Sequence, residues 1–303
     1  MASEAGFCAL VGAAKSGTST LAQRLHLHPQ ITLGVEKELD FFSFDHNYAK
    51  GRAHYDALFP DLQPGQFRLD ASTSYARVPQ LPGVPARIRG HFPTARIVYL
   101  LRNPIERAYS HYVHRFSKEL HPGRPFDRTF EQHVADDPMC LDSSDYRLQL
   151  EAYLGSFPRE QILCLFTEDL DREETATVLR TCEFLGLRTS PDDVPPLPRR
   201  RNVSSRNREE QARAKLVAML KSLPLVERVR PLLPLAVRRA TLGAIAGLGV
   251  GRALQRGFVP PPMRPDTHAA LVARFAPMIA WLERFTGRDL SHWSAPDRAL
   301  AAR

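Results

Sequence analysis

The chain is poor in cysteine and lysine and has no long hydrophobic run. Its 303 residues include four cysteines, Cys8, Cys140, Cys164 and Cys182, which are widely separated and form no C-x-x-C pair. This spacing argues against a zinc site and a dense disulfide framework, and we expect buried thiols in a reducing compartment. No run reaches the ~18 hydrophobic residues that a membrane span needs, and no signal-peptide pattern opens the chain. We therefore expect a cytoplasmic protein without a transmembrane segment.

Because lysine is rare, arginine supplies most of the formal net charge of +8. A basic excess suits an anionic partner such as a nucleotide, a sulfated or phosphorylated ligand, nucleic acid or an acidic membrane, and does not choose among them. Hydrophobic residues make up 43% and charged residues 24%, an ordinary globular mixture that excludes global disorder. The length suits either one large α/β domain or two smaller ones.

Short hydrophobic runs alternate with helical patterns along the chain. The runs predict strands at residues 7–12, 31–34, 66–71, 96–101 and 161–166. Helical spacing predicts helices that end at His26, begin at Pro104, span residues 175–185 and end at Gly287. Continuous hydrophobic strands that alternate with helices are typical of a parallel sheet covered on both faces.

The segment G-A-A-K-S-G-T-S-T at residues 12–20 lies between a predicted strand and a predicted helix. Small residues let several backbone N–H groups face one anion, and the helix N-terminus adds partial positive charge. These features predict a phosphate-binding loop. It is not a Walker A loop, which would require glycine at Ala9 and Ala14. The candidate phosphate ligands are Lys15, Ser16, Gly17, Thr18, Ser19 and Thr20.

A second motif, R-I-V-Y-L-L-R-N-P-I-E-R-A-Y-S, covers residues 96–110. Its strand ends at Arg102, and the helix that follows carries Ser110 about two turns later. An arginine and a hydroxyl placed in this way can hold one phosphate from two sides. Taken alone, the motif is better explained by an arginine salt bridge and a solvent-facing serine.

Two further segments carry candidate acid–base groups. In E-K-E-L-D-F-F (residues 36–42), charged residues precede two aromatic ones near the expected ligand edge of the sheet, where a carboxylate can take a proton from an acceptor. A solvated charge run before two core aromatics is the alternative. The segment L-D-A-S-T-S-Y (residues 69–75) reads by itself as a polar turn after a strand.

Together these motifs resemble those of sulfotransferases that use 3′-phosphoadenosine 5′-phosphosulfate (PAPS). The run K-S-G-T-S-T-L (residues 15–21) is similar to that family's phosphosulfate loop, and L-R-N-P-I-E-R-A-Y-S (residues 101–110) is similar to its 3′-phosphate element. K-E-L-D-F-F (residues 37–42) resembles the K-E-x-x-F-F of heparan sulfate sulfotransferases. The resemblance implies a P-loop-like three-layer α/β/α fold with a central, mostly parallel sheet and added helices in the C-terminal half. It also implies PAPS as co-substrate, adenosine 3′,5′-bisphosphate as product, and no metal.

The resemblance assigns roles to particular residues. It makes Glu38 the catalytic base, Lys37 its basic neighbour and Lys15 the cation that stabilises developing charge. His46, in a segment similar to the H-N-Y-x-K-G of glucosaminyl N-sulfotransferases, becomes a second acid–base candidate.

The resemblance also shows where this chain departs from the family. In residues 69–75, Asp70 stands for glutamate, Thr73 for proline, and Ala71 for a lysine that helps catalysis in animal relatives. Arg201 and Asn202 fall where the family places a basic loop over the nucleotide, and they are the last nucleotide-binding candidates.

We therefore predict a sulfotransferase that moves the sulfuryl group of PAPS to a hydroxyl or amine of a carbohydrate, glycolipid or small molecule. We expect no nucleic-acid partner, and the sequence indicates no oligomeric state. Residues 1–303 are predicted to form a single domain, with residues 192–258 as a loop plus a helical excursion near the nucleotide and acceptor. Tyr146 and Gln149 are expected near the acceptor. The alternatives are a P-loop nucleotide kinase or NTPase, and a non-enzymatic basic protein that binds polyanions.

Overall fold

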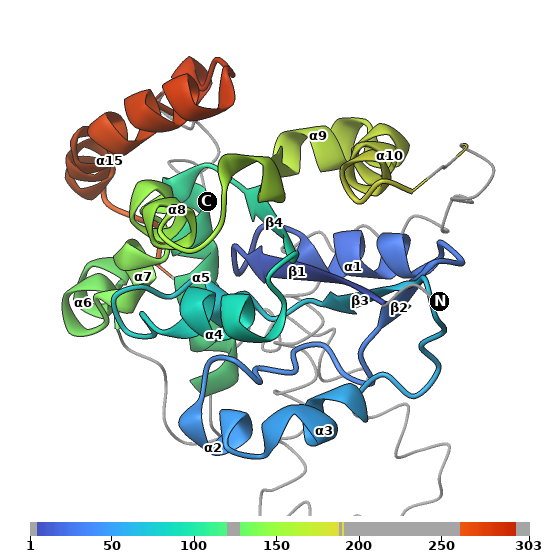
Figure 1. Cartoon of the computed structure of the whole chain (residues 1–303). Coiled ribbons are helices and arrows are strands. Elements are labelled where there is room, and N and C mark those ends of the chain that lie inside the picture. The colour runs from blue at the N-terminus through green and yellow to red at the C-terminus, as the bar shows by residue number, and fades with distance from the viewer. Residues whose placement is uncertain (1–4, 120–127, 188–189, 191–260, 295–303) are drawn as a thin grey trace, which may run out of the picture. The chain divides into compact units, whose positions relative to one another are not determined.

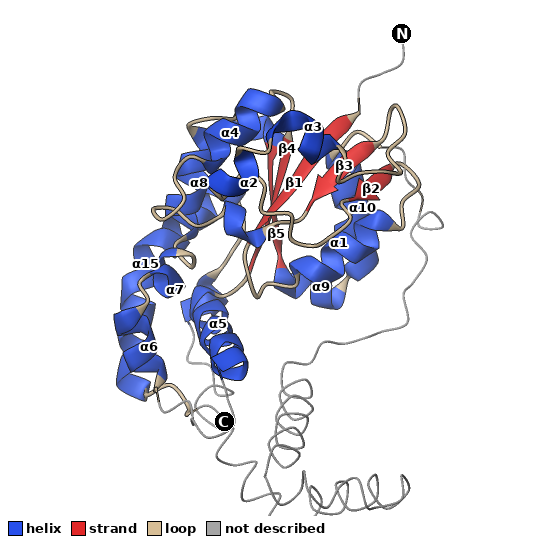
Figure 2. Ribbon diagram, turned by 90° about the horizontal axis from the view of Figure 1, so that it is seen from below, coloured by secondary structure: helices blue, strands red, loops and turns tan. Residues whose placement is uncertain are grey.

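Five parallel strands form one sheet in the computed structural model, which describes residues 5–119, 128–187, 190 and 261–294. The sheet order is β2-β3-β1-β4-β5, and each neighbouring pair is parallel (Figure 2). The strands are β1 (Gly6–Gly12), β2 (Ile31–Leu33), β3 (Phe67–Asp70), β4 (Arg96–Leu101) and β5 (Ile162–Phe166). All five strands that the sequence predicts are confirmed.

Helices cover both faces of this sheet. Helices α1 (Thr18–His26), α9 (Thr167–Arg172) and α10 (Glu174–Phe184) lie on one face, and α3 (Gly51–Asp56) and α4 (Val84–His91) on the other (Figure 1). This arrangement confirms the predicted three-layer α/β/α fold. The remaining described elements are α2 (Asp45–Tyr48), η1 (Thr73–Tyr75), α5 (Pro104–Glu119), α6 (Phe130–Asp136), α7 (Met139–Asp142), α8 (Tyr146–Leu154), η2 (Arg159–Gln161), α15 (Pro265–Thr286) and η5 (Ser291–Ser294).

The central strand β1 shows why the sheet is buried on both sides. Successive side chains of a strand point to opposite faces of the sheet. The continuous hydrophobic run of β1 therefore places hydrophobic side chains on both faces, and each face must be covered by a core. Cys8 and Leu10 belong to the core formed with α1 and α10. Phe7 stacks on Phe92, with ring centroids 4.1 Å apart, in an aromatic cluster on the opposite face.

The chain divides into two compact units. The first comprises residues 1–111, 137–198 and 265–297 and contains the whole sheet, and the second comprises residues 112–136, 199–264 and 298–303. Within the second unit, the Tyr112 hydroxyl donates to the Arg128 carbonyl at 2.8 Å. Residues 192–258 lie outside the described residues, and the single-domain organisation stays a prediction.

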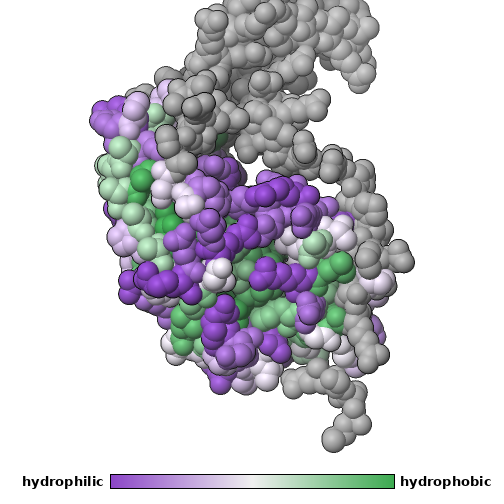
Figure 3. All heavy atoms as spheres, turned by 90° about the horizontal axis from the view of Figure 1, so that it is seen from above, coloured by the Kyte–Doolittle hydropathy of each residue, from purple (hydrophilic) through white to green (hydrophobic). Residues whose placement is uncertain are grey.

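On the face seen in Figure 3, the described residues present many hydrophilic side chains with hydrophobic patches between them. Within the described ranges, no helix has the length and hydrophobicity needed to cross a membrane. The four cysteines are buried and free, which agrees with the sequence-based interpretation of small core residues.

Candidate functional site

The predicted site motifs follow neighbouring strands at one edge of the sheet. The Lys15 loop follows β1, the Glu38 segment follows β2, residues 71–75 follow β3, and Arg102 follows β4. Because the strands are parallel, their carboxyl ends lie at the same edge, where open α/β sheets bind their ligands. The polar segments that the sequence singles out are thus brought together by the topology.

The loop after β1 has a backbone that favours glycine. Gly17 has a φ of 94° and Lys15 a φ of 76°, both in the left-handed region. A Cβ atom on Gly17 would also lie 3.3 Å from Cδ2 of Leu170. Gly17 directly precedes α1, so the N–H groups of the first helical turn, beginning at Thr18, face the loop and are suited to an anion.

The hydroxyl side chains of this loop differ in exposure. Thr18 is buried and Ser19 is exposed. Ser16 is fully buried, and its Oγ has no hydrogen-bond partner among the described residues. A buried, unsatisfied hydroxyl is unusual, because burying it without a partner costs free energy. The Ser16 carbonyl lies 2.8 Å from Thr167 Oγ1, a contact that secures the loop to the end of β5.

Arg102 joins the two predicted phosphate motifs. Its Nη1 donates to the Lys15 carbonyl at 3.2 Å, while Nε and Nη2 donate to Glu106 Oε2 at 3.0 and 2.7 Å. A guanidinium has five N–H donors, so one donor on each terminal nitrogen stays available for a bidentate phosphate contact. Ser110 is half-buried on α5, and among the described contacts no hydrogen bond joins it to Arg102.

Arg107 contacts the backbone of the Lys15 loop from the buried side, a role that the sequence did not predict. It is fully buried, donates to Ser144 Oγ at 2.6 Å and to the Cys140 carbonyl, and reaches the Ala14 carbonyl at 3.5 Å. Arg107 and Ser110 are three residues apart on the predicted helix and so share one face of it, but an arginine on such a polar face is equally typical of a solvent-facing side chain.

Glu38 is held by two neighbours. Thr73 Oγ1 lies 2.8 Å from Oε1 and 2.9 Å from Oε2 of Glu38, and Lys37 Nζ lies 3.1 Å from Oε1. The Glu38 side chain keeps 28% of its surface exposed, so it remains accessible to an acceptor. The sequence predicts Lys37 as a neighbour of Glu38 but gives Thr73 no role.

A pocket of about 490 Å³ opens beside Glu38. Carboxylates, imidazoles and hydrophobic side chains line it together, and the exposed His46 ring stacks on Phe44 with ring centroids 5.7 Å apart. The structure therefore brings both acid–base candidates, Glu38 and His46, to one pocket. Its lining residues are Val35, Glu36, Glu38, Leu39, Asp40, Phe41, Phe44, His46, Asn47, Lys50, His54 and Leu58.

Asp70 lies beneath this region as a buried carboxyl group. It accepts hydrogen bonds from Tyr55 Oη at 2.9 Å, Tyr75 Oη at 2.6 Å and Ser72 Oγ at 2.6 Å. Burial raises the pKa of Asp70 to about 6, although the three hydrogen bonds act in the opposite direction. The group is therefore a structural anchor and is enclosed too deeply to meet an acceptor.

Tyr146 and Gln149, which the sequence places near the acceptor, are not among the residues that line this pocket, and their approach to the acceptor stays a prediction. Both side chains are fully buried. Tyr146 Oη donates to the Arg102 carbonyl at 2.6 Å, and Gln149 bonds both the N–H and the carbonyl of Val78 at 2.8 Å. Their hydrogen bonds hold the backbone around the site. The remaining candidates, Arg201 and Asn202, lie outside the described residues.

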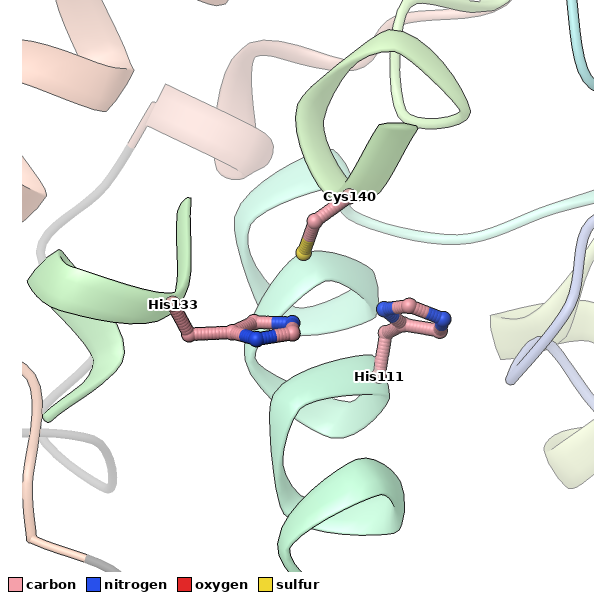
Figure 4. Close-up of side chains that lie close together, drawn as sticks. All are labelled: His111, His133 and Cys140. Carbon is pink, nitrogen blue, oxygen red and sulfur yellow. The ribbon is translucent and has the colours of Figure 1, made fainter. Parts of the chain in front are cut away.

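Away from this edge, Cys140 of α7 lies near His111 of α5 (Figure 4). The thiol donates to the Ala108 carbonyl at 3.5 Å, and burial raises the pKa of Cys140 to about 11. With no metal ion beside it, Cys140 therefore carries its proton at neutral pH. Figure 4 also draws His133, which belongs to the second unit.

Comparison with known proteins identifies the family. The model of the sulfotransferase domain family matches residues 8–214, a range that contains the Lys15 loop, Glu38 and Arg102. The chain belongs to the sulfotransferase family. This membership favours the sulfotransferase interpretation over the kinase and polyanion-binding alternatives.

Individual sulfotransferases are similar to parts or all of the chain. Mouse heparan sulfate glucosamine 3-O-sulfotransferase 6 is 32% identical over 185 residues, which is 59% of this chain and 52% of the relative. Human heparan sulfate glucosamine 3-O-sulfotransferase 3B1 is 30% identical over 189 residues, 59% of this chain and 45% of the relative. The chain thus spans about half the length of these curated relatives. A sulfotransferase crystal structure from Alicyclobacillus acidocaldarius aligns with a TM-score of 0.64 and 26% identity, covering 97% of this chain and 100% of that one.

Proposed function

We propose that this sulfotransferase moves the sulfuryl group of PAPS to a hydroxyl or amine of a carbohydrate, glycolipid or small-molecule acceptor. The observation that carries the proposal is the hydrogen bond between Arg102 and the Lys15 carbonyl, which joins the two phosphate-binding motifs at one edge of the sheet. PAPS carries a 5′-phosphosulfate and a 3′-phosphate, and two linked anion sites suit such a ligand.

In this proposal each anionic group of PAPS has its own partners. Lys15 and the N–H groups at the start of α1 hold the 5′-phosphosulfate and stabilise the negative charge that grows as the sulfuryl group leaves. Arg102 and Ser110 hold the 3′-phosphate, which ATP lacks.

Glu38 performs the proton transfer. As the acceptor oxygen or nitrogen forms its bond to sulfur, the bond from sulfur to the 5′-phosphate oxygen breaks, and Glu38 takes the acceptor proton. The products are the sulfated acceptor and adenosine 3′,5′-bisphosphate. By analogy with phosphoryl transfer, the protein supplies positioning and charge stabilisation and forms no covalent bond to the transferred group.

The acceptor binds in the pocket beside Glu38. The names of the curated relatives, heparan sulfate glucosamine 3-O-sulfotransferases, favour a carbohydrate acceptor. Phe44, a half-buried aromatic side chain among the lining residues, offers apolar surface to a sugar ring. The cytoplasmic location that the sequence predicts stays a prediction.

A transfer screen tests the proposed function. The full chain is incubated with PAPS carrying labelled sulfate, in the presence of a chelator, with carbohydrate, glycolipid, phenolic and amine acceptors. We expect label on one acceptor class and tighter binding of adenosine 3′,5′-bisphosphate than of ATP. In a parallel assay with ATP and magnesium but no chelator, ATP turnover with no sulfate transfer from PAPS would support the kinase alternative. Salt-sensitive heparin binding with no transfer would support the polyanion-binding alternative.

A further inference from the structure

We propose that three consecutive hydroxyl groups, Ser72, Thr73 and Ser74, position Glu38 for proton transfer, with Thr73 as the residue that orients its carboxylate. We call these three residues the hydroxyl clamp. The proposal rests on the proposed function, in which Glu38 is the general base. Thr73 touches Glu38 and not the reacting atoms, so it is a positioning residue.

The contacts of Thr73 fix the direction of the Glu38 carboxylate. Thr73 Oγ1 lies 2.8 and 2.9 Å from the two carboxylate oxygens, so its single proton is shared between them. Lys37 adds a contact to Oε1 alone, at 3.1 Å. Among the described residues, Oε2 therefore has fewer partners than Oε1. We assign Oε2 as the oxygen that receives the acceptor proton.

The other two hydroxyls hold the backbone two residues after Glu38. Asp40 has a φ of 53°, in the left-handed region that costs a non-glycine residue energy. Its N–H donates to Ser72 Oγ at 3.0 Å, and its Oδ1 accepts from Ser74 Oγ. Ser74 Oγ also lies 2.5 Å from Ser43 Oγ. A strained residue persists only where its surroundings determine it, and here the clamp supplies those contacts.

The clamp is itself anchored in the core. Ser72 Oγ gives its proton to the buried Asp70 at 2.6 Å, so the lone pairs of the same oxygen are left to accept the Asp40 N–H. Asp70 is held in turn by Tyr55 and Tyr75. A continuous chain of hydrogen bonds thus runs from the end of β3 to the segment that carries Glu38. Such a chain provides the orientation that a general base needs.

Thr73→Val tests the clamp, because valine keeps the shape of threonine and removes the hydroxyl. We expect kcat to fall about tenfold, since losing a hydrogen bond to a charged group costs on the order of 1.5 kcal/mol. The acceptor is whichever molecule gains label in the transfer screen. The Kd of adenosine 3′,5′-bisphosphate and the KM of PAPS should stay within about twofold. Thr73→Ser should restore most of kcat.

Thr32→Val is the matched control. Thr32 is also buried, and its hydroxyl donates a hydrogen bond to Gln66 Oε1 at 2.9 Å, which the valine would remove. Thr32 lies on β2 and is not among the residues that line the pocket. It should cost similar stability and leave kcat unchanged.

The outcomes separate the clamp from the proposed function. Normal kcat in Thr73→Val, or equal losses in Thr73→Val, Thr73→Ser and Thr32→Val, would overturn the clamp while Glu38→Gln stays inactive. If Glu38→Gln is fully active, or wild type transfers no sulfate from PAPS, the proposed mechanism fails and the clamp fails with it.

Discussion

Replacing Arg102 with alanine should selectively weaken the binding of nucleotides that carry a 3′-phosphate. The Arg102 guanidinium already contacts the Lys15 carbonyl and Glu106, and these bonds fix its position. One N–H on each terminal nitrogen is left for a phosphate. In Arg102→Ala both of these donors disappear, whereas the Lys15 loop, which we propose as the 5′-phosphate site, keeps its own side chains.

The size of the effect follows from the two lost contacts. A hydrogen bond to a charged group contributes about 1.5–3 kcal/mol. The Arg102 side chain is 26% exposed, and solvent screening favours the lower end of that range. Two such bonds give about 3 kcal/mol, which is roughly a hundredfold in Kd. Arg102→Lys keeps the charge but not the bidentate geometry, and it should show an intermediate loss.

Calorimetric titration with adenosine 3′,5′-bisphosphate and with AMP measures this effect. Arg102→Ala should weaken the bisphosphate about a hundredfold and AMP only a few-fold, because AMP has no 3′-phosphate. Arg96→Ala is the control, since Arg96 begins the strand that Arg102 follows and contacts the Glu160 carbonyl at 3.1 Å. Equal losses for both nucleotides in Arg102→Ala, or no loss, would refute the assignment.

Three further predictions concern Asp70, Gly17 and His46. Burial raises the pKa of Asp70 from 3.8 to about 6, so the folded protein retains a proton there that the unfolded chain releases, and stability present at pH 4 is lost as pH rises through 6. Urea unfolding should therefore show wild type losing about 2 kcal/mol more than Asp70→Asn between pH 4 and 7, and parallel profiles would contradict this. Gly17→Ala should lower the free energy of unfolding in urea by about 1–2 kcal/mol and weaken the binding of adenosine 3′,5′-bisphosphate. The reason is that Gly17 has a φ of 94° and that the new Cβ would press on Leu170. Unchanged stability and binding would contradict the loop geometry. His46→Ala should raise the acceptor KM several-fold with little change in kcat, since its exposed ring lines the pocket, and a hundredfold fall in kcat would instead make His46 the second acid–base group.

The sheet was predictable because buried parallel strands carry continuous hydrophobic runs. Residues 96–101 were predicted as a strand and form β4, and the other four strands agree within two residues at each end. The edge positions of Lys15, Glu38 and Arg102 followed from the same pattern, since each comes directly after a strand or within a few residues of one.

Contacts between distant segments were beyond the sequence. Thr73 meets Glu38 across 35 positions, and Arg107 reaches the Ala14 carbonyl across 93. The residue types alone do not predict these contacts, because a threonine is also typical of a turn and an arginine of a solvent-facing helix surface. The fold alone decides that these side chains point inward.

The most direct test of the account is sulfate transfer by Glu38→Gln. General bases contribute about 10²–10⁴-fold, and glutamine keeps the shape of glutamate without its basicity. The account predicts that transfer of labelled sulfate from PAPS falls to background while the Kd of adenosine 3′,5′-bisphosphate stays within about twofold of wild type. Full transfer activity in Glu38→Gln would contradict the central claim that this residue takes the acceptor proton.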